Sequence, residues 1–415
     1  MPGDDSKNSE FTLHRLETDD DIEQYLELIR NVFGQTSGAD TLAKNLIDHH
    51  PKMTLKNFFV MKHQGRIIAT LNLIPVQWSI GGIPLKVAEM GHVATLAEYR
   101  YRGLQRTLAN EFHKEVERQG YDLCAIEGIA YFYRQFGYEY ALPLLEETKI
   151  RLDQLPTSSA KANIRPFTRG DIHEAAQRLA RSQERFYVHT IRDERIWRMQ
   201  EQTKTASGDK FEGYSLEKDG EMVAYFRISD KPEENVLVLR EASDADDHAN
   251  EAILAFLKHV GKQRGFEHLM SRMSYQDPLT QKLVSLGAVQ DNPPYAFQIR
   301  VPDYAAVFWK MKPLFERRLA ESTYSHLTEK LNFNFRRYTI QIHVEDGSIR
   351  DVQKLDTDED RTIGLNPLVF VQLLLGYRSR HELEMVYPDF RIRQSHRYLI
   401  DVLFPKLPSH IHAAY

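Results

Sequence analysis

An arginine-rich turn between a β-prone stretch and a helical one has the residue types and spacing best suited to binding phosphate. The apolar run 93–96 ends in this turn, where Arg100, Arg102 and Gly103 precede a helical pattern that begins at Leu104. A helix N-terminus presents unpaired N–H groups and a partial positive charge. Arginine adds charge-assisted hydrogen bonds, and glycine lets the backbone approach a ligand closely. The turn therefore predicts a pyrophosphate cradle.

The aromatic segment 131–140 is a second group of residues that could take part in chemistry. It follows one helical pattern and one short apolar run. A phenol has an ordinary pKa of about 10, so each tyrosine of this segment would be protonated at neutral pH and could donate a proton. Each of these tyrosines also suits an aromatic core. The residue types alone leave both interpretations open.

The patterns around the turn predict an α/β domain. Apolar residues recur at helical spacing after Asp19 and again from Gly103 to Gly120. The order of helix, several strands, phosphate-binding turn, helix and buried strand is typical of a sheet covered by helices. The predicted strands are 58–61, 67–74, 78–80, 89–96 and 123–126.

The same order of patterns returns after residue 155, but its turn has the opposite charge. Asp244, Asp246 and Asp247 stand where the first copy has arginines, and carboxylates would repel pyrophosphate. We therefore expect a structural copy that does not bind the cofactor. A third pattern begins near Val301 and ends in an apolar, proline-containing tail. The predicted units are 1–155, 156–300 and 301–415.

Composition describes an ordinary globular protein. The 415 residues are 42% hydrophobic and 27% charged, and the net charge of −5 gives no general attraction to nucleic acid or anionic membrane. Cys124 is the single cysteine, which excludes an intramolecular disulfide and suits a reducing compartment. The polar N-terminus lacks the apolar core of a signal peptide. We expect a cytoplasmic protein with no nucleic-acid or membrane partner.

Two motifs carry a resemblance to a known superfamily. The strand, the Arg100-x-x-Gly103 turn and the helix resemble the coenzyme A-binding motif of GCN5-related N-acetyltransferases (GNAT), and Tyr133-x-x-Phe136-Gly137-Tyr138 resembles their closing aromatic segment. The three-part order looks like the Eis (enhanced intracellular survival) family. The resemblance implies tandem GNAT folds, each a mixed sheet flanked by helices, followed by a sterol carrier protein 2-like α+β domain. Gln105 departs from the superfamily pattern, which prefers glycine or alanine there, although Eis-like proteins also have a bulkier residue.

The resemblance also implies roles for single residues. Tyr133 would protonate the departing thiolate, and the α-carboxylate of Tyr415 would be the base. A frayed chain end is the ordinary alternative for Tyr415. Phe33 would line the amine pocket, unless it is a core residue. The residues expected to hold acetyl-coenzyme A are Val93, Ala94, Thr95, Tyr101, Arg102, Gly103, Leu104, Gln105, Arg106, Gly128 and Ile129.

The expected activity is transfer of an acetyl group from acetyl-coenzyme A to a primary amine by direct attack. An aminoglycoside, a polyamine or a lysine-like amine would be the acceptor, no metal would be needed, and the resemblance implies a homo-oligomer, a hexamer. The alternative is a non-catalytic protein that senses acyl-coenzyme A in the first domain or binds a lipid in the third. Thiol release with a panel of amines distinguishes the two.

Overall fold

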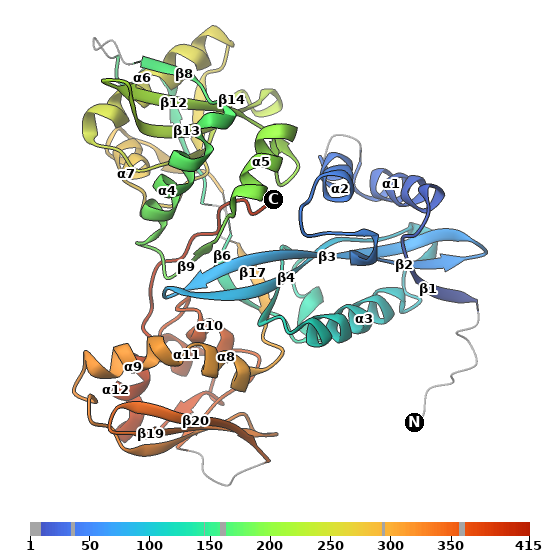
Figure 1. Ribbon diagram of the computed structural model, residues 1–415, viewed down its shortest axis with the longest axis vertical. Helices are drawn as coiled ribbons and strands as arrows, with labels where there is room; N and C mark the ends of the chain where they lie inside the picture. The colour runs from blue at the N-terminus through green and yellow to red at the C-terminus, as the bar shows by residue number, and fades with distance from the viewer. Residues whose placement is uncertain (1–9, 35–37, 145, 158–162, 293–294, 357–361) are drawn as a thin grey trace.

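The computed structural model describes residues 10–34, 38–144, 146–157, 163–292, 295–356 and 362–415. Within these ranges the chain forms three lobes, each built on a β-sheet with helices packed against it (Figure 1). In this part of the chain no helix is both long and apolar enough to span a membrane.

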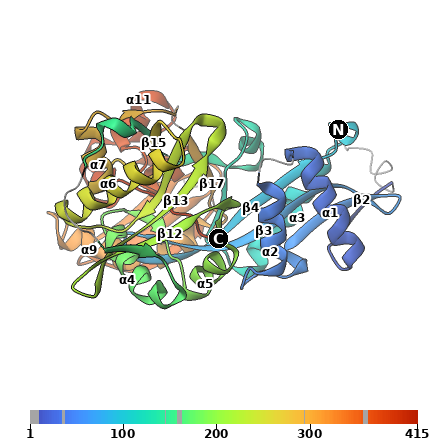
Figure 2. The same cartoon turned by 90° about the horizontal axis from the view of Figure 1, so that it is seen from above.

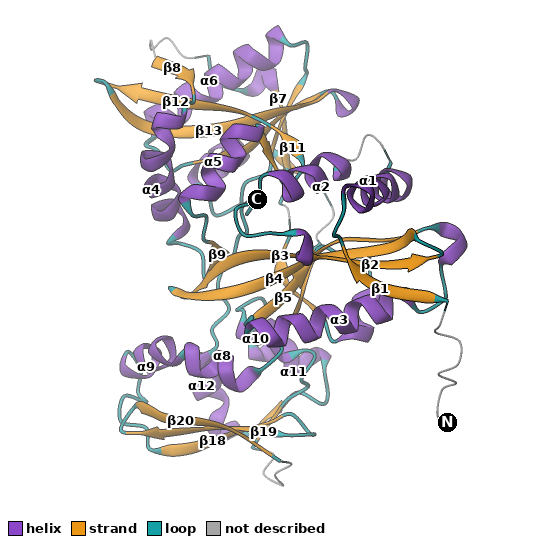
Figure 3. Cartoon of the chain, turned by 45° about the vertical axis from the view of Figure 1, so that its right-hand side comes forward, coloured by secondary structure: helices purple, strands orange, loops and turns teal. Residues whose placement is uncertain are grey.

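The first lobe is an eight-stranded mixed sheet between helices. Its elements are β1 (Phe11–Arg15), α1 (Asp19–Phe33), α2 (Ala39–Asp48), β2 (Phe58–His63), β3 (Arg66–Ile80), β4 (Ile83–Thr95), α3 (Leu104–Gln119), β5 (Leu123–Ile126), β6 (Glu139–Pro143), β9 (Val188–Thr190) and β17 (Ala296–Arg300). The strand order is β1-β2-β3-β4-β5-β17-β6, and β9 pairs with β3. Helices α1 and α2 lie on one face and α3 on the other (Figures 1 and 3).

The second lobe repeats this plan with a seven-stranded sheet in the order β16-β7-β15-β14-β13-β12-β8. Its elements are β7 (Thr148–Arg151), β8 (Asn163–Pro166), α4 (Ile172–Gln183), α5 (Glu194–Thr203), the hairpin of β10 (Thr205–Ala206) and β11 (Asp209–Lys210), β12 (Glu212–Lys218), β13 (Glu221–Lys231), β14 (Val236–Ala242), α6 (Asp247–Gln263), β15 (His268–Ser271), α7 (Pro278–Ser285) and β16 (Val289–Gln290).

The two sheets exchange a strand. β17 follows the second lobe in sequence but lies between β5 and β6 of the first sheet, and β7 follows the first lobe but lies between β15 and β16 of the second. Divisions at residues 155 and 300 follow chain order and therefore assign each of these strands to the sheet it does not join. The exchange ties the two lobes together through main-chain hydrogen bonds.

The third lobe packs helices on one face of a five-stranded sheet in the order β20-β19-β18-β21-β22. Its elements are α8 (Tyr304–Lys310), α9 (Lys312–Ala320), β18 (Glu329–Asn334), β19 (Thr339–Glu345), β20 (Ser348–Leu355), β21 (Ile363–Gly364), α10 (Phe370–Leu374), α11 (Arg380–Val386), β22 (Arg391–Ile392) and α12 (Gln394–Leu403). Phe308, Phe333, Phe370 and Phe404 pack ring against ring between helices and sheet.

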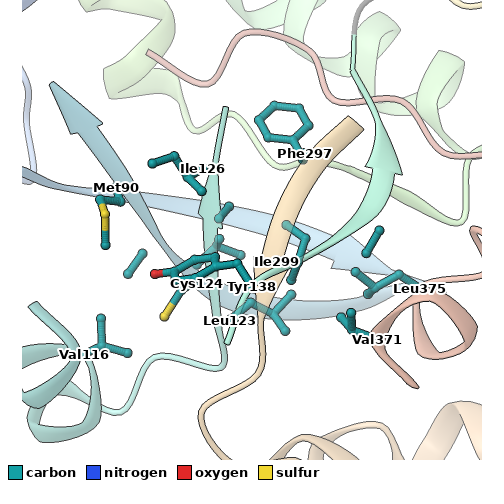
Figure 4. Close-up of a cluster of buried hydrophobic side chains, with 14 of the residues drawn as sticks. Met90, Val116, Leu123, Cys124, Ile126, Tyr138, Phe297, Ile299, Val371 and Leu375 are labelled. Atoms are coloured by element: carbon teal, nitrogen blue, oxygen red, sulfur yellow. The ribbon is translucent and has the colours of Figure 1, made fainter. Parts of the chain in front are cut away.

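The core of the first lobe surrounds β5 and β17. Figure 4 shows Cys124 beside Tyr138, with Ile299 of β17 nearby. Cys124 is fully buried, and burial raises the pKa of its thiol to about 11, so it packs as a small apolar side chain. The four residues of β5 are all buried, as expected of a strand covered on both faces.

The mixed α/β architecture predicted from the sequence is confirmed. The helix predicted between Gly103 and Gly120 is α3, and both glycines adopt left-handed backbone angles at its ends, where a side chain would be strained. The strands predicted at 67–74 and 78–80 are one strand, β3, because pairing with β4 continues without interruption to the hairpin turn.

Candidate active site

The site begins where two parallel strands separate. β4 and β5 pair only from Val87 to Glu89 and from Leu123 to Ala125. Beyond Glu89, β4 continues to Thr95 with β3 on one side and, among the described residues, no strand on the other. The unpaired edge of β4 therefore presents main-chain hydrogen-bonding groups at the open side of the separation.

A β-bulge lies on β4 just past the separation. Asn72 pairs with Gly91 and Thr70 with Ala94, so β4 has one more residue than β3 in this interval. His92 adopts a left-handed φ of 46°. Its Nδ1 lies 3.0 Å from the Tyr25 hydroxyl and from the Asn72 amide nitrogen. A bulge redirects the strand beyond it, so these contacts help fix the course of residues 93–95 along the edge of the sheet.

Gln105 joins the end of β4 to the start of α3. Its Nε2 donates to the main-chain oxygens of Ala94 at 2.8 Å and Thr70 at 3.2 Å, and to Thr95 Oγ1 at 2.9 Å. The sequence assigned Gln105 only to the turn. In the structure its side chain also sets how β4 and the helix start lie relative to each other.

For the acetyl-coenzyme A that the sequence resemblance implies, replacing Gln105 with leucine should raise the KM about tenfold, because three hydrogen-bond acceptors, two of them at the end of β4, lose their shared donor. The value of kcat at saturation should change less than threefold, since Gln105 holds the backbone rather than a reacting group. Steady-state kinetics measure both values. A Gln119→Leu variant, at the exposed end of the same helix, is the control. An unchanged KM would contradict this role.

The turn before α3 has the geometry of an anion site. Tyr101 and Gly103 adopt left-handed φ values of 64° and 78°. Within the described residues, the main-chain N–H groups of 101–105 have no hydrogen-bond acceptor. Arg102 stacks over the rings of Phe11 and Tyr99. Free donors at a helix start, with arginines beside them, attract phosphate groups.

Tyr133 lies on the other side of the separation, in the 3-10 turn η4 (Phe132–Phe136). Its ring packs on Gly128, where an added Cβ would lie 2.1 Å from a ring carbon. The side chain is 5% exposed, and burial raises the pKa of the phenol. No described residue hydrogen-bonds to its hydroxyl, so the proton is available to a ligand.

The exchanged strand holds the segment that carries Gly128. Tyr295 Oη donates to the Gly128 main-chain oxygen at 2.5 Å, and Gln298 Nε2 donates to it at 3.0 Å. Gln298 belongs to β17 and is fully buried. Residues from the end of the second unit thus fix the loop on which Tyr133 rests.

Two carboxyl groups lie at the end of the β4–β5 pairing. Glu89 is 9% exposed, and burial together with the neighbouring Glu127 raises its pKa to about 8. Glu127 is accessible to solvent, yet the protein packed around it raises its pKa to about 7. Neither residue is predicted from the sequence patterns, although Glu127 directly follows the apolar run of β5, which is a usable signal.

The chain end reaches Glu89. Tyr415 is 9% exposed, and its hydroxyl donates to Glu89 at 2.6 Å. One oxygen of its α-carboxylate accepts the N–H of Ser207, in the turn of the β10–β11 hairpin, at 2.6 Å. In Figures 1 and 2 the end of the chain lies between the first and second lobes.

The tail leading to Tyr415 is bound along β9 and α5. Main-chain hydrogen bonds join Tyr187 to Pro408 and His410 to Val188. Further along, Arg192 Nε donates to the Ala413 oxygen at 3.1 Å. Arg192 is itself buried and forms a bidentate ion pair with Glu241 of β14.

The remaining predicted residues are distributed around the separation. Val93, Ala94 and Thr95 end β4, and Ile129 is 70% exposed beside Gly128. Phe33 ends α1, is 40% exposed and meets His92 edge to face. Leu104 begins α3 and is buried under it, and Arg106 Nη2 donates to Gln135 of the aromatic segment. The described residues contain no group of three His, Cys, Asp or Glu side chains that could hold a metal.

A comparison with family models identifies the first lobe. Residues 14–141 match the acetyltransferase (GNAT) domain. This range contains the strand separation, the turn before α3 and Tyr133. The chain therefore carries a GNAT acetyltransferase domain, which supports acyltransferase enzyme activity. No curated protein matches the sequence.

Solved structures share the whole three-lobed fold. A GCN5-related N-acetyltransferase from Anabaena variabilis is 14% identical with a TM-score of 0.74, and a probable N-acyltransferase of Enterococcus faecalis is 16% identical with a TM-score of 0.72. Eis1 from Mycobacterium abscessus is 14% identical with a TM-score of 0.63. In each case the alignment covers 98% of this chain and 100% of the other. At these identities the likeness concerns the fold alone.

Proposed function

We propose that the protein transfers an acetyl group from acetyl-coenzyme A to a primary amine. One observation carries this proposal. The open edge of β4, the donor-rich turn at residues 101–105 and the phenol of Tyr133 all lie around one strand separation within the GNAT domain. These three features supply what acyl transfer from a thioester needs: an extended binding edge, a pyrophosphate site and a proton donor.

The cofactor would bind from the turn toward the separation. The N–H groups of 101–105 and the arginines at 102 and 106 would hold the pyrophosphate. Backbone groups of Val93–Thr95 would hold the pantetheine arm and polarise the thioester carbonyl, as an edge strand readily does. Gly128 and Ile129 would line the far side of the arm. The turn fits the pyrophosphate because the main-chain N–H groups of 101–105 have no acceptor among the described residues.

The reaction would proceed by direct attack. The amine nitrogen forms a bond to the acetyl carbon, and the carbon–sulfur bond breaks. The departing thiolate takes the phenolic proton of Tyr133, and the proton lost by the amine passes to the α-carboxylate of Tyr415. An α-carboxyl group has an ordinary pKa of about 3.5, so it is ionised at neutral pH and can accept that proton directly or through water.

The three units would have different roles. The first, 1–155, would hold the chemistry, and the second, 156–300, would be a GNAT-like copy without a cofactor. In support, Asp246 caps α6 by accepting the N–H of Ala249, so a side chain already occupies that helix start. The third, 301–415, would be sterol-carrier-like and would deliver the chain end. We further propose an Eis-like, cytoplasmic homo-oligomer, a hexamer, whose subunit number light scattering measures.

The acceptor would be an aminoglycoside, a polyamine or a lysine-like amine, with Phe33 at its pocket. Supplying acetyl-coenzyme A with each amine in turn should release free thiol with at least one of them, and mass spectrometry should find that amine heavier by one acetyl group. Tight binding of acetyl-coenzyme A with no thiol release from any amine would contradict the proposal. That result would favour the acyl-coenzyme A sensor. No observation favours lipid binding, since aromatic rings pack through the third lobe's interior.

A further inference from the structure

The hydrogen bond between Tyr415 and Glu89 joins two residues at opposite ends of the chain's architecture. Glu89 belongs to β4, whose open edge borders the separation from β5, and Tyr415 ends the tail of the third unit. The donor–acceptor distance is 2.6 Å, and each residue is only 9% exposed. Among the described residues, no other side chain hydrogen-bonds to Glu89 and no cation forms an ion pair with it.

Glu89 is an unfavourable residue for this position if packing alone matters. A buried carboxyl group without a cationic partner destabilises the fold when it is ionised. Glu127 beside it adds like charge, which further disfavours ionisation. An apolar side chain would fill the same space at no such cost. The hydrogen bond that the Glu89 carboxyl group accepts from the Tyr415 phenol therefore explains why a carboxyl group is present at this position.

Tyr415 is fixed at two points that lie on different units. Its phenol is held by the first unit, and one oxygen of its α-carboxylate is held by Ser207 of the second. The hairpin that carries Ser207 is itself seated against the first unit, because an added Cβ on Gly208 would lie 2.9 Å from the Gly38 oxygen. The two contacts together restrain both the position and the rotation of the terminal residue.

We propose that Glu89 is a positioning residue that acts through the Tyr415 phenol. Together with Ser207, it fixes the end of the chain beside the separation of β4 and β5. Glu89 takes no proton from the amine in this role. It orients the group that does, so the kinetic consequence of the inference rests on the proposed function. Its structural consequence, an immobilised chain end, does not.

The test is a double-mutant cycle with a conservative third variant. Glu89→Leu removes the acceptor, Tyr415→Phe removes the donor while leaving the chain end intact, and Glu89→Gln keeps an acceptor oxygen. Tyr398→Phe, on an exposed tyrosine of α12, is the control for loss of a phenol. Each variant is measured by steady-state kinetics and by hydrogen exchange of the peptide that covers the tail, whose His410 N–H is bonded to Val188.

Glu89→Leu and Tyr415→Phe should each lower kcat about tenfold, with the KM for acetyl-coenzyme A unchanged within about twofold. Each should also speed exchange of the tail about tenfold. The double variant should be no worse than either single one, because both remove the same contact. Glu89→Gln should stay within about threefold of the unchanged protein in both measurements, because its side-chain oxygen still accepts the phenol.

Multiplicative effects in the double variant would overturn the proposal, because they would show two independent contributions. Glu89→Gln as slow as Glu89→Leu, with normal exchange of the tail, would also overturn it and would assign Glu89 a direct part in the chemistry. If the unchanged protein acetylates no amine, the hydrogen-exchange rates of the same four proteins still test whether Glu89 positions Tyr415. Coupled exchange effects would then support the positioning role while the proposed function fails.

Discussion

Tyr133→Phe should lower kcat for acetyl transfer about 100-fold or more, which is the usual contribution of a positioned proton donor. The KM for acetyl-coenzyme A should change less than about twofold, because the ring, which packs on Gly128, is retained. The fold should also be retained, since no described residue depends on the Tyr133 hydroxyl for a hydrogen bond. Steady-state kinetics with the best amine, together with thermal unfolding, measure these three quantities.

Two neighbouring tyrosines provide matched controls for Tyr133. Tyr131 is 71% exposed in the same aromatic segment, and Tyr138 is fully buried with its hydroxyl 3.1 Å from His113 Nε2. Phenylalanine at position 131 should leave kcat unchanged, and at position 138 it should lower the melting temperature with little effect on kcat. A Tyr133→Phe enzyme with unchanged kcat would exclude this phenol as the acid.

The pH dependence gives a second reading of the same group. Burial raises the pKa of the Tyr133 phenol above its ordinary value of 10.0. A group that must be protonated to act loses activity only as pH rises through its own pKa. Ionisation of Tyr133 should therefore cause no fall in kcat up to about pH 10. A decline at lower pH would have to come from another group.

Local features of the site could be predicted from the sequence because local physics determines them. Gly103 and the arginines around it define a helix start, and α3 begins and ends at the predicted glycines. The buried strand β5 follows from its apolar run. The match of residues 14–141 to the GNAT domain agrees with the motif that these residues form. Each of these features depends on neighbours within a few positions.

Features that depend on distant parts of the chain could not be predicted in this way. The exchange of β7 and β17 depends on strands that are distant in the sequence. These two short strands carry no signal that favours one sheet over the other. In the sequence Gln105 is a departure from the superfamily pattern. In the structure its side chain donates to three acceptors on β3 and β4. Glu89 meets Tyr415 across the whole chain, and no periodicity connects them.

Moving the terminal carboxylate away from the site should lower kcat about 100-fold or more, because the amine would lose its proton acceptor. Appending Gly-Gly after Tyr415 does this while keeping the phenol that Glu89 holds. Removing residues 413–415 should have the same effect on kcat. In both variants the affinity for acetyl-coenzyme A should change less than about threefold, since the turn at 101–105 and the edge of β4 remain. Isothermal calorimetry measures that affinity without turnover.

Comparison with Tyr415→Phe separates the carboxylate from the phenol. That variant keeps the chain end and loses only the contact with Glu89, so its kcat should fall about tenfold, less than in the extended chain. If the extended chain turns over as fast as the unchanged one, the terminal carboxylate is not the base. Glu127, solvent-accessible with its pKa raised to about 7, would then be the carboxylate to replace next. The order of the two effects therefore identifies which part of residue 415 serves the reaction.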